Sequence, residues 1–164
     1  MKIIVAIVFY LIFWGCCFLG TGTDKKNLAG LRSYPEEVQH RVRENSELAD
    51  SAPGKKPVWM ILLSNLLVFT VVFTVIGLAF RNILGLNGFL QTFLYFLALG
   101  EGLGLFDLVV IDLLWWRNSK RIRFSFLPEK EPYQDPKMHI DSFLRGIPLF
   151  AGIAALTAAI LVVQ

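Results

Sequence analysis

Four long apolar stretches dominate this sequence and constrain its fold more than any other feature. They cover residues 3–19, 58–80, 89–116 and 146–163 of the 164-residue chain. A helix needs about 20 apolar residues to cross a ~30 Å hydrocarbon layer, and three of the stretches approach or exceed that length. Backbone polar groups must be paired within lipid, so only helices or a closed barrel can span it. The stretches lack the alternating polarity of a barrel. We therefore predict an all-α, four-transmembrane-helix bundle that forms a single membrane domain over residues 1–164.

The distribution of positive charge predicts the topology. Of the 16 lysines and arginines, seven lie in residues 20–57, seven in residues 117–145, and only Lys2 and Arg81 elsewhere. Loops rich in Lys and Arg stay on the cytoplasmic side of a cell membrane. We expect loops 21–56 and 117–145 to be cytoplasmic and both termini to lie outside. The tryptophans would then form an aromatic belt at the cytoplasmic face, namely Trp14, Trp59, Trp115 and Trp116.

The first apolar stretch is interpreted as a retained helix. It carries one lysine and an apolar core, but no small-residue cleavage site typical of a signal peptide. Its adjacent Cys16 and Cys17 have no other cysteine as a partner. We interpret them as small buried hydrophobic residues, because Phe13-Trp14-Gly15 differs from the small-residue motif of a lipoprotein signal.

The first polar loop contains a predicted amphipathic helix over residues 35–44. Ser33 is a suitable cap, and acidic residues follow in the first turn, where they favour the helix dipole. Val38 and Val42 are four residues apart and would share one face. This helix is too weakly apolar to insert deeply, so we expect it to lie on the membrane surface or on the other loop.

The second polar loop begins with a dense run of cations. Near a membrane such a run favours binding of anionic lipid headgroups, each cation contributing about 1 kcal/mol. We do not expect nucleic acid as a partner, because the lipid already supplies the counter-charge. Three prolines within residues 128–136 exclude a regular helix there. The predicted headgroup ligands are Arg117, Lys120, Arg121 and Arg123.

A set of short motifs resembles a known group of proteins. Phe106-Asp107, Ile111-Asp112, the tryptophan pair, the basic run, Tyr133-x-Asp135 and Phe143-Leu144-x-Gly146 occur in order, with Tyr34-Pro35-Glu36-Glu37 in the first loop. Together they cover about half the chain and resemble an uncharacterised family of small four-helix integral membrane proteins of Gram-positive bacteria. Residues 128–132 read Pro-Glu-Lys-Glu-Pro and depart from that group's Pro-Gly-Thr-Glu-Asp. The resemblance implies a four-helix protein of the bacterial plasma membrane and implies no activity.

Acidic residues in the third apolar stretch are the strongest candidates for a functional site. A carboxylate at bilayer depth costs several kcal/mol unless it is protonated, paired or hydrated. Glu101 and Asp112 are eleven residues apart and would share one face of an α-helix, whereas Asp107 would point elsewhere. Glu101 is the candidate for proton or ion handling.

Structural roles for these acids remain alternatives. Glu101 would hold the bundle together through a hydrogen bond to Asn65 or Thr70. Asp112 would pair with Arg117 or Arg145 near the headgroups.

A second group of polar residues is expected near the cytoplasmic edge of the membrane. His139 and several carboxylates could bind a divalent cation or perform acid–base chemistry. The candidates are Asp107, Asp112 and His139 for a metal, and Asp112, Asp135 and His139 for catalysis, with Tyr133 and Asp141 nearby. Their spacing matches no known metal motif. The alternative is a structural clamp in which the acids pair with the basic run.

Small residues predict close helix packing. Gly100, Gly102 and Gly104 would let the third helix approach a neighbour, and a ridge on the fourth helix consists of Ala151, Ala155 and Ala159. We expect the third and fourth helices to pack tightly, or one ridge to form a homo-oligomer. Pro148 would kink or start the fourth helix.

The sequence favours a non-enzymatic function. It contains no recognised nucleophile, nucleotide motif or cofactor loop, and no cofactor is predicted. We expect a transport-related or accessory subunit with a buried acidic site on the third helix. Four helices leave little room for a pathway, so transport would require a homo-oligomer or a larger membrane complex. The alternative is a small membrane-embedded enzyme acting on a lipid or isoprenoid at the cytoplasmic interface.

Overall fold

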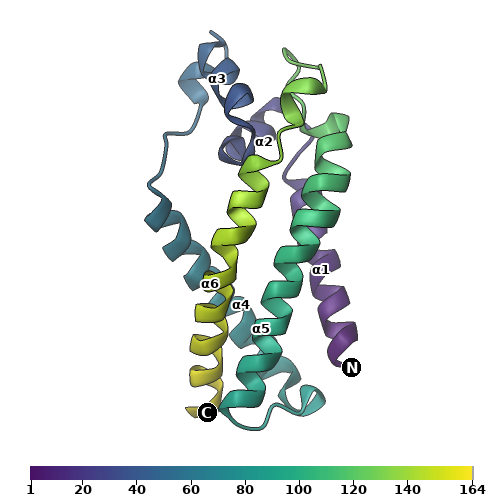
Figure 1. Cartoon of the computed structure of the whole chain (residues 1–164), viewed down its shortest axis with the longest axis vertical. Coiled ribbons are helices and arrows are strands. Elements are labelled where there is room, and N and C mark those ends of the chain that lie inside the picture. Colours follow the sequence, from purple (N-terminus) through teal and green to yellow (C-terminus); the bar gives the residue numbers. More distant parts are fainter. Residues whose placement is uncertain (164) are drawn as a thin grey trace. The chain divides into compact units, whose positions relative to one another are not determined.

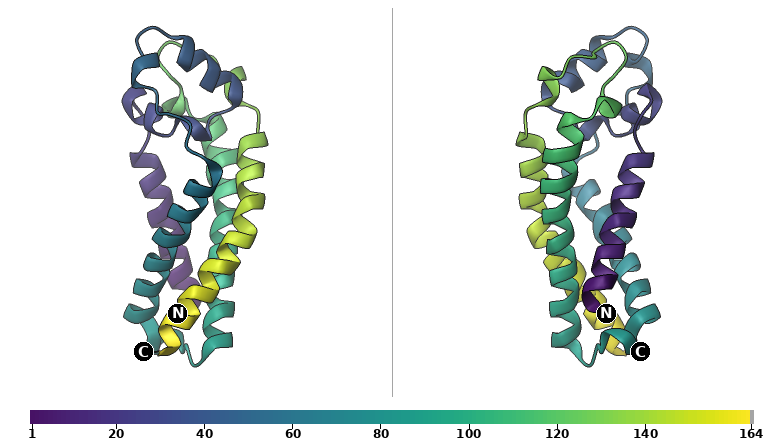
Figure 2. Two further views of the ribbon diagram at one scale, coloured as in Figure 1. Left: turned by 90° about the vertical axis from the view of Figure 1, so that its left-hand side faces the viewer. Right: turned by 90° about the vertical axis from the view of Figure 1, so that its right-hand side faces the viewer.

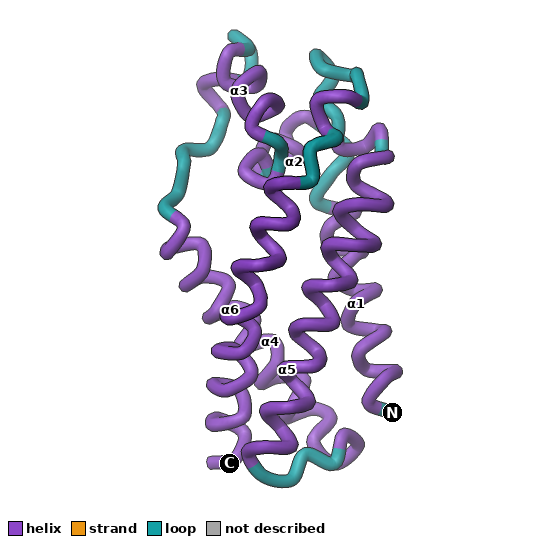
Figure 3. Tube along the Cα trace, viewed as in Figure 1, coloured by secondary structure: helices purple, strands orange, loops and turns teal. Residues whose placement is uncertain are grey.

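The computed structural model describes residues 1–163 and is helical, with no strand among them (Figures 1 and 3). Residues 1–10, 56–105 and 144–163 form unit 1, and residues 11–55 and 106–143 form unit 2. Helices α1 and α6 contribute to both. The elements are α1 (Lys2–Leu19), α2 (Asp24–Ala29), η1 (Leu31–Ser33), α3 (Glu36–Glu44), η2 (Ala49–Ser51), α4 (Val58–Leu84), α5 (Phe89–Phe106), the π-helical η3 (Asp107–Trp115), η4 (Trp116–Asn118), η5 (Lys120–Ile122), η6 (Glu131–Tyr133) and α6 (Lys137–Val163).

Four helical segments of the described chain are long and apolar enough to cross a membrane. They are Lys2–Leu19, Val58–Leu84, Phe89–Asn118 and Glu131–Val163. This confirms the all-α class and a multi-pass membrane protein with four candidate spans. Helix α4 continues past the predicted residue 80 to Leu84 and ends at Gly85, whose φ of 60° is the left-handed conformation that glycine adopts readily at a helix end.

Unit 1 is packed almost entirely by apolar side chains. Phe73 and Phe96 are fully buried and stack with ring centroids 5.3 Å apart. Phe150 of α6 stacks on Phe73 at 6.4 Å. Such ring pairs contribute about 0.5–1.5 kcal/mol each beyond their buried area. Shape complementarity among α4, α5 and α6 therefore holds this unit together.

Close contact of α5 with α6 depends on Gly100. A Cβ added there would lie 2.6 Å from Cδ1 of Phe150. This confirms that the third and fourth spanning helices pack tightly. The predicted ridge of Ala151, Ala155 and Ala159 is not the buried face of α6: the fully buried alanines are Ala154 and Ala158, while Ala159 is exposed, and a role of that ridge in a homo-oligomer stays a prediction.

Unit 2 contains a separate core built from both polar loops, which lie side by side in both views of Figure 2. Val38 and Val42 of α3 are fully buried in it, confirming the predicted amphipathic helix and its packing on the other loop. The core is unusually aromatic for its size. Its buried members are Leu28, Leu31, Tyr34, Val38, Val42, Trp116, Ile122, Phe124, Leu127 and Tyr133.

Hydrogen bonds between the loops fix their register. The Tyr34 hydroxyl donates to the carbonyl of Ile122 at 2.8 Å. The Asn27 side chain donates to the carbonyls of Arg121 and Arg123 at 3.2 and 3.3 Å. Because these groups are buried or half-buried, an unmade bond would cost about 1–3 kcal/mol each. The first loop therefore determines the path of the basic run.

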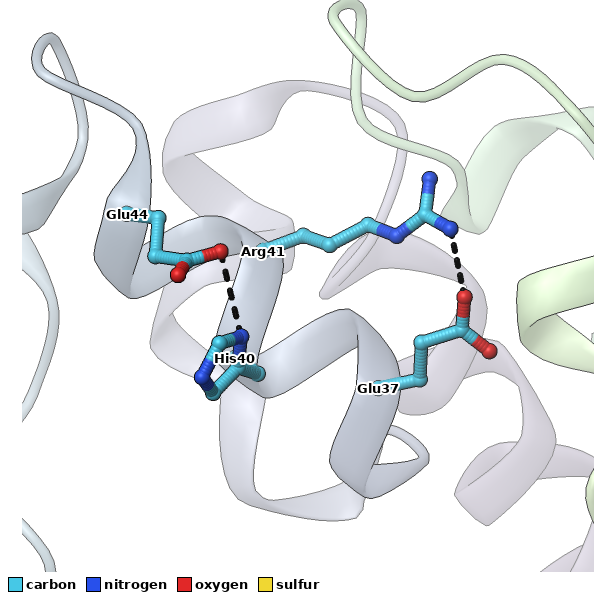
Figure 4. Close-up of polar contacts among 4 residues, drawn as sticks. All are labelled: Glu37, His40, Arg41 and Glu44. Carbon is cyan, nitrogen blue, oxygen red and sulfur yellow. Dashed lines mark hydrogen bonds and ion pairs between the residues drawn. The ribbon is translucent and has the colours of Figure 1, made fainter.

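The other face of α3 is polar. Arg41 pairs with Glu37 at 2.5 Å and His40 with Glu44 at 3.1 Å, each one helical turn apart (Figure 4). All four side chains are largely exposed, so the pairs contribute only a few tenths of a kcal/mol. Helix α3 is thus held by its two valines rather than by its charges.

Two sequence predictions were wrong near the second polar loop. Helix α6 begins at Lys137 rather than residue 146, so that the loop ends at residue 136 and Pro148 lies inside the helix. The Asp135 carboxylate accepts a hydrogen bond from the Lys137 N–H at 2.9 Å, which satisfies a free donor of the first turn. Trp116 is 6% exposed and packs in the core of unit 2, so the prediction that it is a membrane anchor was wrong, whereas Trp59 is 63% exposed.

Candidate functional site

The site begins with a change of helical winding after Phe106. Residues Asp107–Trp115 form a π-helix, in which hydrogen bonds join residue i to residue i+5. Residues five apart therefore lie nearly above one another. Asp107 and Asp112 have this spacing, so the winding places on one side two acids that an α-helix would separate. The prediction that Asp107 points away from Asp112 was wrong, because it assumed α-helical winding.

Asp112 pairs with a histidine from the start of α6. The Asp112 Oδ2 atom lies 2.9 Å from Nδ1 of His139. The two side chains are 16% and 5% exposed, so water competes little for this contact. The expected pairing of Asp112 with Arg117 or Arg145 was wrong, since neither forms a salt bridge with it among residues 1–163. The site thus joins η3 with the start of α6.

The second nitrogen of His139 is buried and unsatisfied. Its Nε2 atom has no hydrogen-bond partner among the described residues. Because Nδ1 faces a carboxylate, it carries the hydrogen in the neutral ring and leaves Nε2 as an acceptor. The Trp116 indole packs against the imidazole at 4.9 Å, close to edge-on, and fixes its plane. A buried acceptor without a partner is costly, and such an atom in a native structure marks a place for a proton, water or ligand.

Two further groups surround this pair. Asp107 is partly buried and within electrostatic range of both Asp112 and His139. The thiol of Cys17, on α1, is within electrostatic range of both aspartates. We call Asp107, Asp112 and His139 the acid–imidazole site.

Asp135 does not join the acid–imidazole site. It is exposed and serves as the cap of α6 described above. Tyr133 lies in the apolar core, where its hydroxyl accepts from the Phe124 N–H at 3.0 Å and donates to the Leu127 carbonyl at 2.9 Å. Asp141 is half-buried and makes no ion pair within residues 1–163. Of the predicted catalytic set, the structure brings together His139 and Asp112 only.

Glu101 belongs to unit 1 and stands alone there. Its side chain is half-buried on α5 and makes no hydrogen bond to Asn65 or Thr70 in the part of the chain described. The Thr70 hydroxyl is itself buried without a partner. The predicted interhelical bond was therefore wrong, and the role of Glu101 in proton handling stays a prediction.

The structure offers no ready-made metal cage. Across residues 1–163, no group of three or more His, Cys, Asp and Glu side chains has a geometry that could hold a metal ion. Asp112 and His139 face each other across a hydrogen-bonding distance, which a metal between them would lengthen. The arrangement suits proton sharing better than coordination.

Sequence reasoning missed two residues of this site. Trp116 was grouped with Trp115 as a membrane anchor, although adjacent residues on a helix point in different directions. Cys17 was interpreted as a small buried hydrophobe, although it is half-buried and within electrostatic range of two acids. No local pattern links α1 to the third helix, so only the tertiary structure reveals that neighbour.

The basic run contributes four cations, all from the second polar loop, which belongs to unit 2: Arg117, Lys120, Arg121 and Arg123. Arg121 stacks on the Phe18 ring at 4.1 Å and donates from Nε to the Phe18 carbonyl at 3.3 Å. Gly22 makes room for it, since a Cβ there would lie 2.7 Å from the guanidinium carbon. Lys120 and Arg123 line an open pocket. The Nε atom of Arg117 is buried without a partner among the described residues.

Comparison with known proteins gives no independent identification. No protein-family model, curated protein or solved structure matches this chain. The resemblance to small four-helix membrane proteins of Gram-positive bacteria stays a prediction. Any function therefore rests on the acid–imidazole site and the surfaces around it.

Proposed function

We propose that this chain is a non-enzymatic, transport-related or accessory membrane subunit whose acid–imidazole site binds and releases a proton. The observation that carries the proposal is the Asp112–His139 pair at 2.9 Å with the second imidazole nitrogen buried and unbonded. An ionisable cluster in a membrane span is expensive, and function is the usual reason to retain one. The acidic site on the third helix is thus centred on Asp107 and Asp112 rather than Glu101.

The proposed topology places this site near the cytoplasmic face. Seven of the chain's 16 cations lie in residues 20–57 and seven in residues 117–145, which favours the cytoplasm for both regions and the outside for both termini. The site lies where the third span ends and the fourth begins, beside the second loop. A proton bound there would exchange with the cytoplasm, and a partner subunit would supply any path across the bilayer.

Infrared difference spectroscopy tests the proton-binding role. Protein in lipid nanodiscs is stepped between two pH values, and the carboxylic-acid C=O band reports acids that gain or lose a proton. We expect a band that is lost or altered in Asp107→Asn and Asp112→Asn. Asp135→Asn is the matched control, because this exposed acid caps α6 and stays outside the site. Equal spectra for the wild type and both site variants refute the proposal, as does a band removed by Glu101→Gln alone.

One observation supports a second candidate, an interfacial enzyme. A carboxylate that holds Nδ1 of an imidazole and leaves Nε2 open is the arrangement of an oriented general base. Substrate would have to reach Nε2, which is buried. Incubation with lipids of the host membrane, followed by mass analysis of the products, separates the two functions. Turnover that is lost in His139→Gln supports the enzyme, whereas unchanged lipids support the accessory subunit.

A further inference from the structure

We propose a second site, independent of the acid–imidazole site: a pocket at Lys120 and Arg123 that binds a phosphate group. The pocket has a volume of about 400 Å³ and lies on the second loop of unit 2. It is lined by Lys120, Arg123, Phe124, Ser125 and Pro128, and we call it the basic pocket. A phosphate group is small enough for this space. Its negative charge is opposite to that of Lys120 and Arg123, the two cations of the pocket.

The cations of the basic run form no salt bridge among residues 1–163. Among residues 1–163, no carboxylate lies within 4.0 Å of a nitrogen of Arg117, Lys120, Arg121 or Arg123. The side chain of Lys120 makes no hydrogen bond in that part of the chain and is exposed. The sequence also allowed a structural clamp in which acids pair with the basic run, but no such ion pair forms among residues 1–163. Unpaired like charges so close together repel one another, and an external anion would relieve that repulsion.

Arg123 is only partly used by the fold. Its Nη1 donates to the carbonyl of Pro128, another lining residue, at 2.9 Å, which restrains the guanidinium at the pocket. Its Nε is buried without a partner among the described residues. An oriented guanidinium with free donors matches the oxygens of a phosphate group, and Lys120 adds a mobile point charge.

The backbone under the pocket is rigidly supported. Ile122 and Phe124, on either side of Arg123, are 0% and 1% exposed and anchor the loop in the core of unit 2. The Asn27 and Tyr34 side chains hold the carbonyls of residues 121–123. The pocket is therefore preorganised by the first loop, which lowers the entropy cost of binding.

Neighbouring polar groups define the site further. Ser125 donates both its N–H and its hydroxyl to the Asp24 carboxylate, so it is not available to a ligand. Arg121 is committed to Phe18, and Lys130 donates to Asn118 at 2.8 Å. This leaves Lys120 and Arg123 as the ligands. Arg117 and Arg121 lie outside this pocket, and their roles as headgroup ligands stay predictions.

The phosphate has two possible sources, an anionic phospholipid headgroup or a free phosphate compound. Native mass spectrometry of detergent-purified protein distinguishes them. One arm adds phosphatidylglycerol, with phosphatidylcholine as the zwitterionic reference, and the other adds inorganic phosphate. Lys120→Ala removes one ligand without touching the core. Lys130→Ala removes one cation from the same loop and is the charge-matched control.

We expect Lys120→Ala to weaken phosphate or phosphatidylglycerol binding about five-fold or more, in line with the loss of one cation at a membrane surface. Arg123→Lys keeps the positive charge but loses the planar guanidinium, which can donate to two phosphate oxygens at once. This variant should therefore also weaken binding. Preference for phosphatidylglycerol assigns a lipid headgroup, and equal binding of inorganic phosphate assigns a free phosphate compound. Lack of binding in both arms overturns the proposal. So does an equal loss in Lys120→Ala and Lys130→Ala, which would indicate net charge alone.

Discussion

Units 1 and 2 are stabilised by different kinds of contact. Unit 1 packs phenylalanines, small residues and leucines, and four of its hydroxyls are buried without a partner among the described residues: Thr70, Thr74, Tyr95 and Thr157. In unit 2 the buried tyrosines Tyr34 and Tyr133 each make a hydrogen bond to the backbone of the second loop. The contrast indicates that shape determines unit 1, whereas hydrogen bonds determine the register of unit 2. Both proposed sites accordingly lie in unit 2.

The largest expected effect comes from Tyr133→Phe. The change removes the partner of two buried backbone groups, the Phe124 N–H and the Leu127 carbonyl. We expect unit 2 to lose about 3 kcal/mol of unfolding free energy. Denaturant titration in detergent, followed by tryptophan fluorescence, measures the loss. The matched control is Tyr95→Phe in unit 1, because the Tyr95 hydroxyl has no hydrogen-bond partner within residues 1–163 and its loss should be nearly neutral. Equal effects of the two variants would remove the contrast between the units.

Next in size is Gly100→Ala. The added Cβ would lie within 3.0 Å of Cβ, Cγ and Cδ1 of Phe150. These atoms are close to the backbone, so the side chain can move little to relieve the clash. Overpacking of this kind should destabilise unit 1 by about 1–2 kcal/mol. Gly15→Ala is the control, because a Cβ there meets nothing within 4 Å. Thermal unfolding of both variants in the same detergent provides the comparison, and equal stability would show that α5 and α6 pack less closely than described.

Alkaline pH should weaken unit 2. Burial, and then the nearby Tyr133 and Asp24, raise the pKa of Tyr34 above its ordinary value of 10.0. A raised pKa means that the folded state keeps the phenol proton longer than the unfolded chain does. Stability is therefore fully present below about pH 10 and falls by about 1.4 kcal/mol per pH unit above it. Unfolding titrations between roughly pH 8 and pH 12, the range in which tyrosine side chains ionise, measure this slope. A slope that Tyr34→Phe does not reduce would argue against the buried phenol.

The smallest effect is expected on the exposed face of α3. Arg41→Ala removes the ion pair with Glu37, in which both side chains are about half-exposed. The change should cost about 0.3–0.5 kcal/mol and lose its effect at high salt. Val42→Ala, on the buried face of the same helix, should cost several times more. A similar cost for both would mean that charge rather than burial attaches α3 to unit 2.

Much of the fold follows from sequence because its signals are local. The apolar runs predict the four spanning helices, and Val38 with Val42 predict the buried face of α3. The end of the third helix could not be predicted. Nothing local indicates that winding changes at Asp107, and that change decides whether Asp107 and Asp112 share a side.

The sequence predicted which residues form the candidate site but not which of them pair with one another. Asp107, Asp112 and His139 stood out as polar residues at the ends of apolar runs. Nearby arginines offered Asp112 equally plausible partners, and only the early start of α6 at Lys137 carries His139 to it. Trp116 illustrates the same limit, since its burial depends on a core formed by two loops far apart in sequence.

The central claim is that Asp112 holds Nδ1 of His139 and leaves Nε2 open. The chain has two histidines, so ¹⁵N-histidine labelling of a His40→Ala variant in nanodiscs gives an NMR signal from His139 alone. We expect the neutral ring to carry its hydrogen on Nδ1, with a signal that changes in Asp112→Asn and stays the same in Asp135→Asn. A ring protonated at Nε2, or a signal indifferent to Asp112→Asn, would contradict the account.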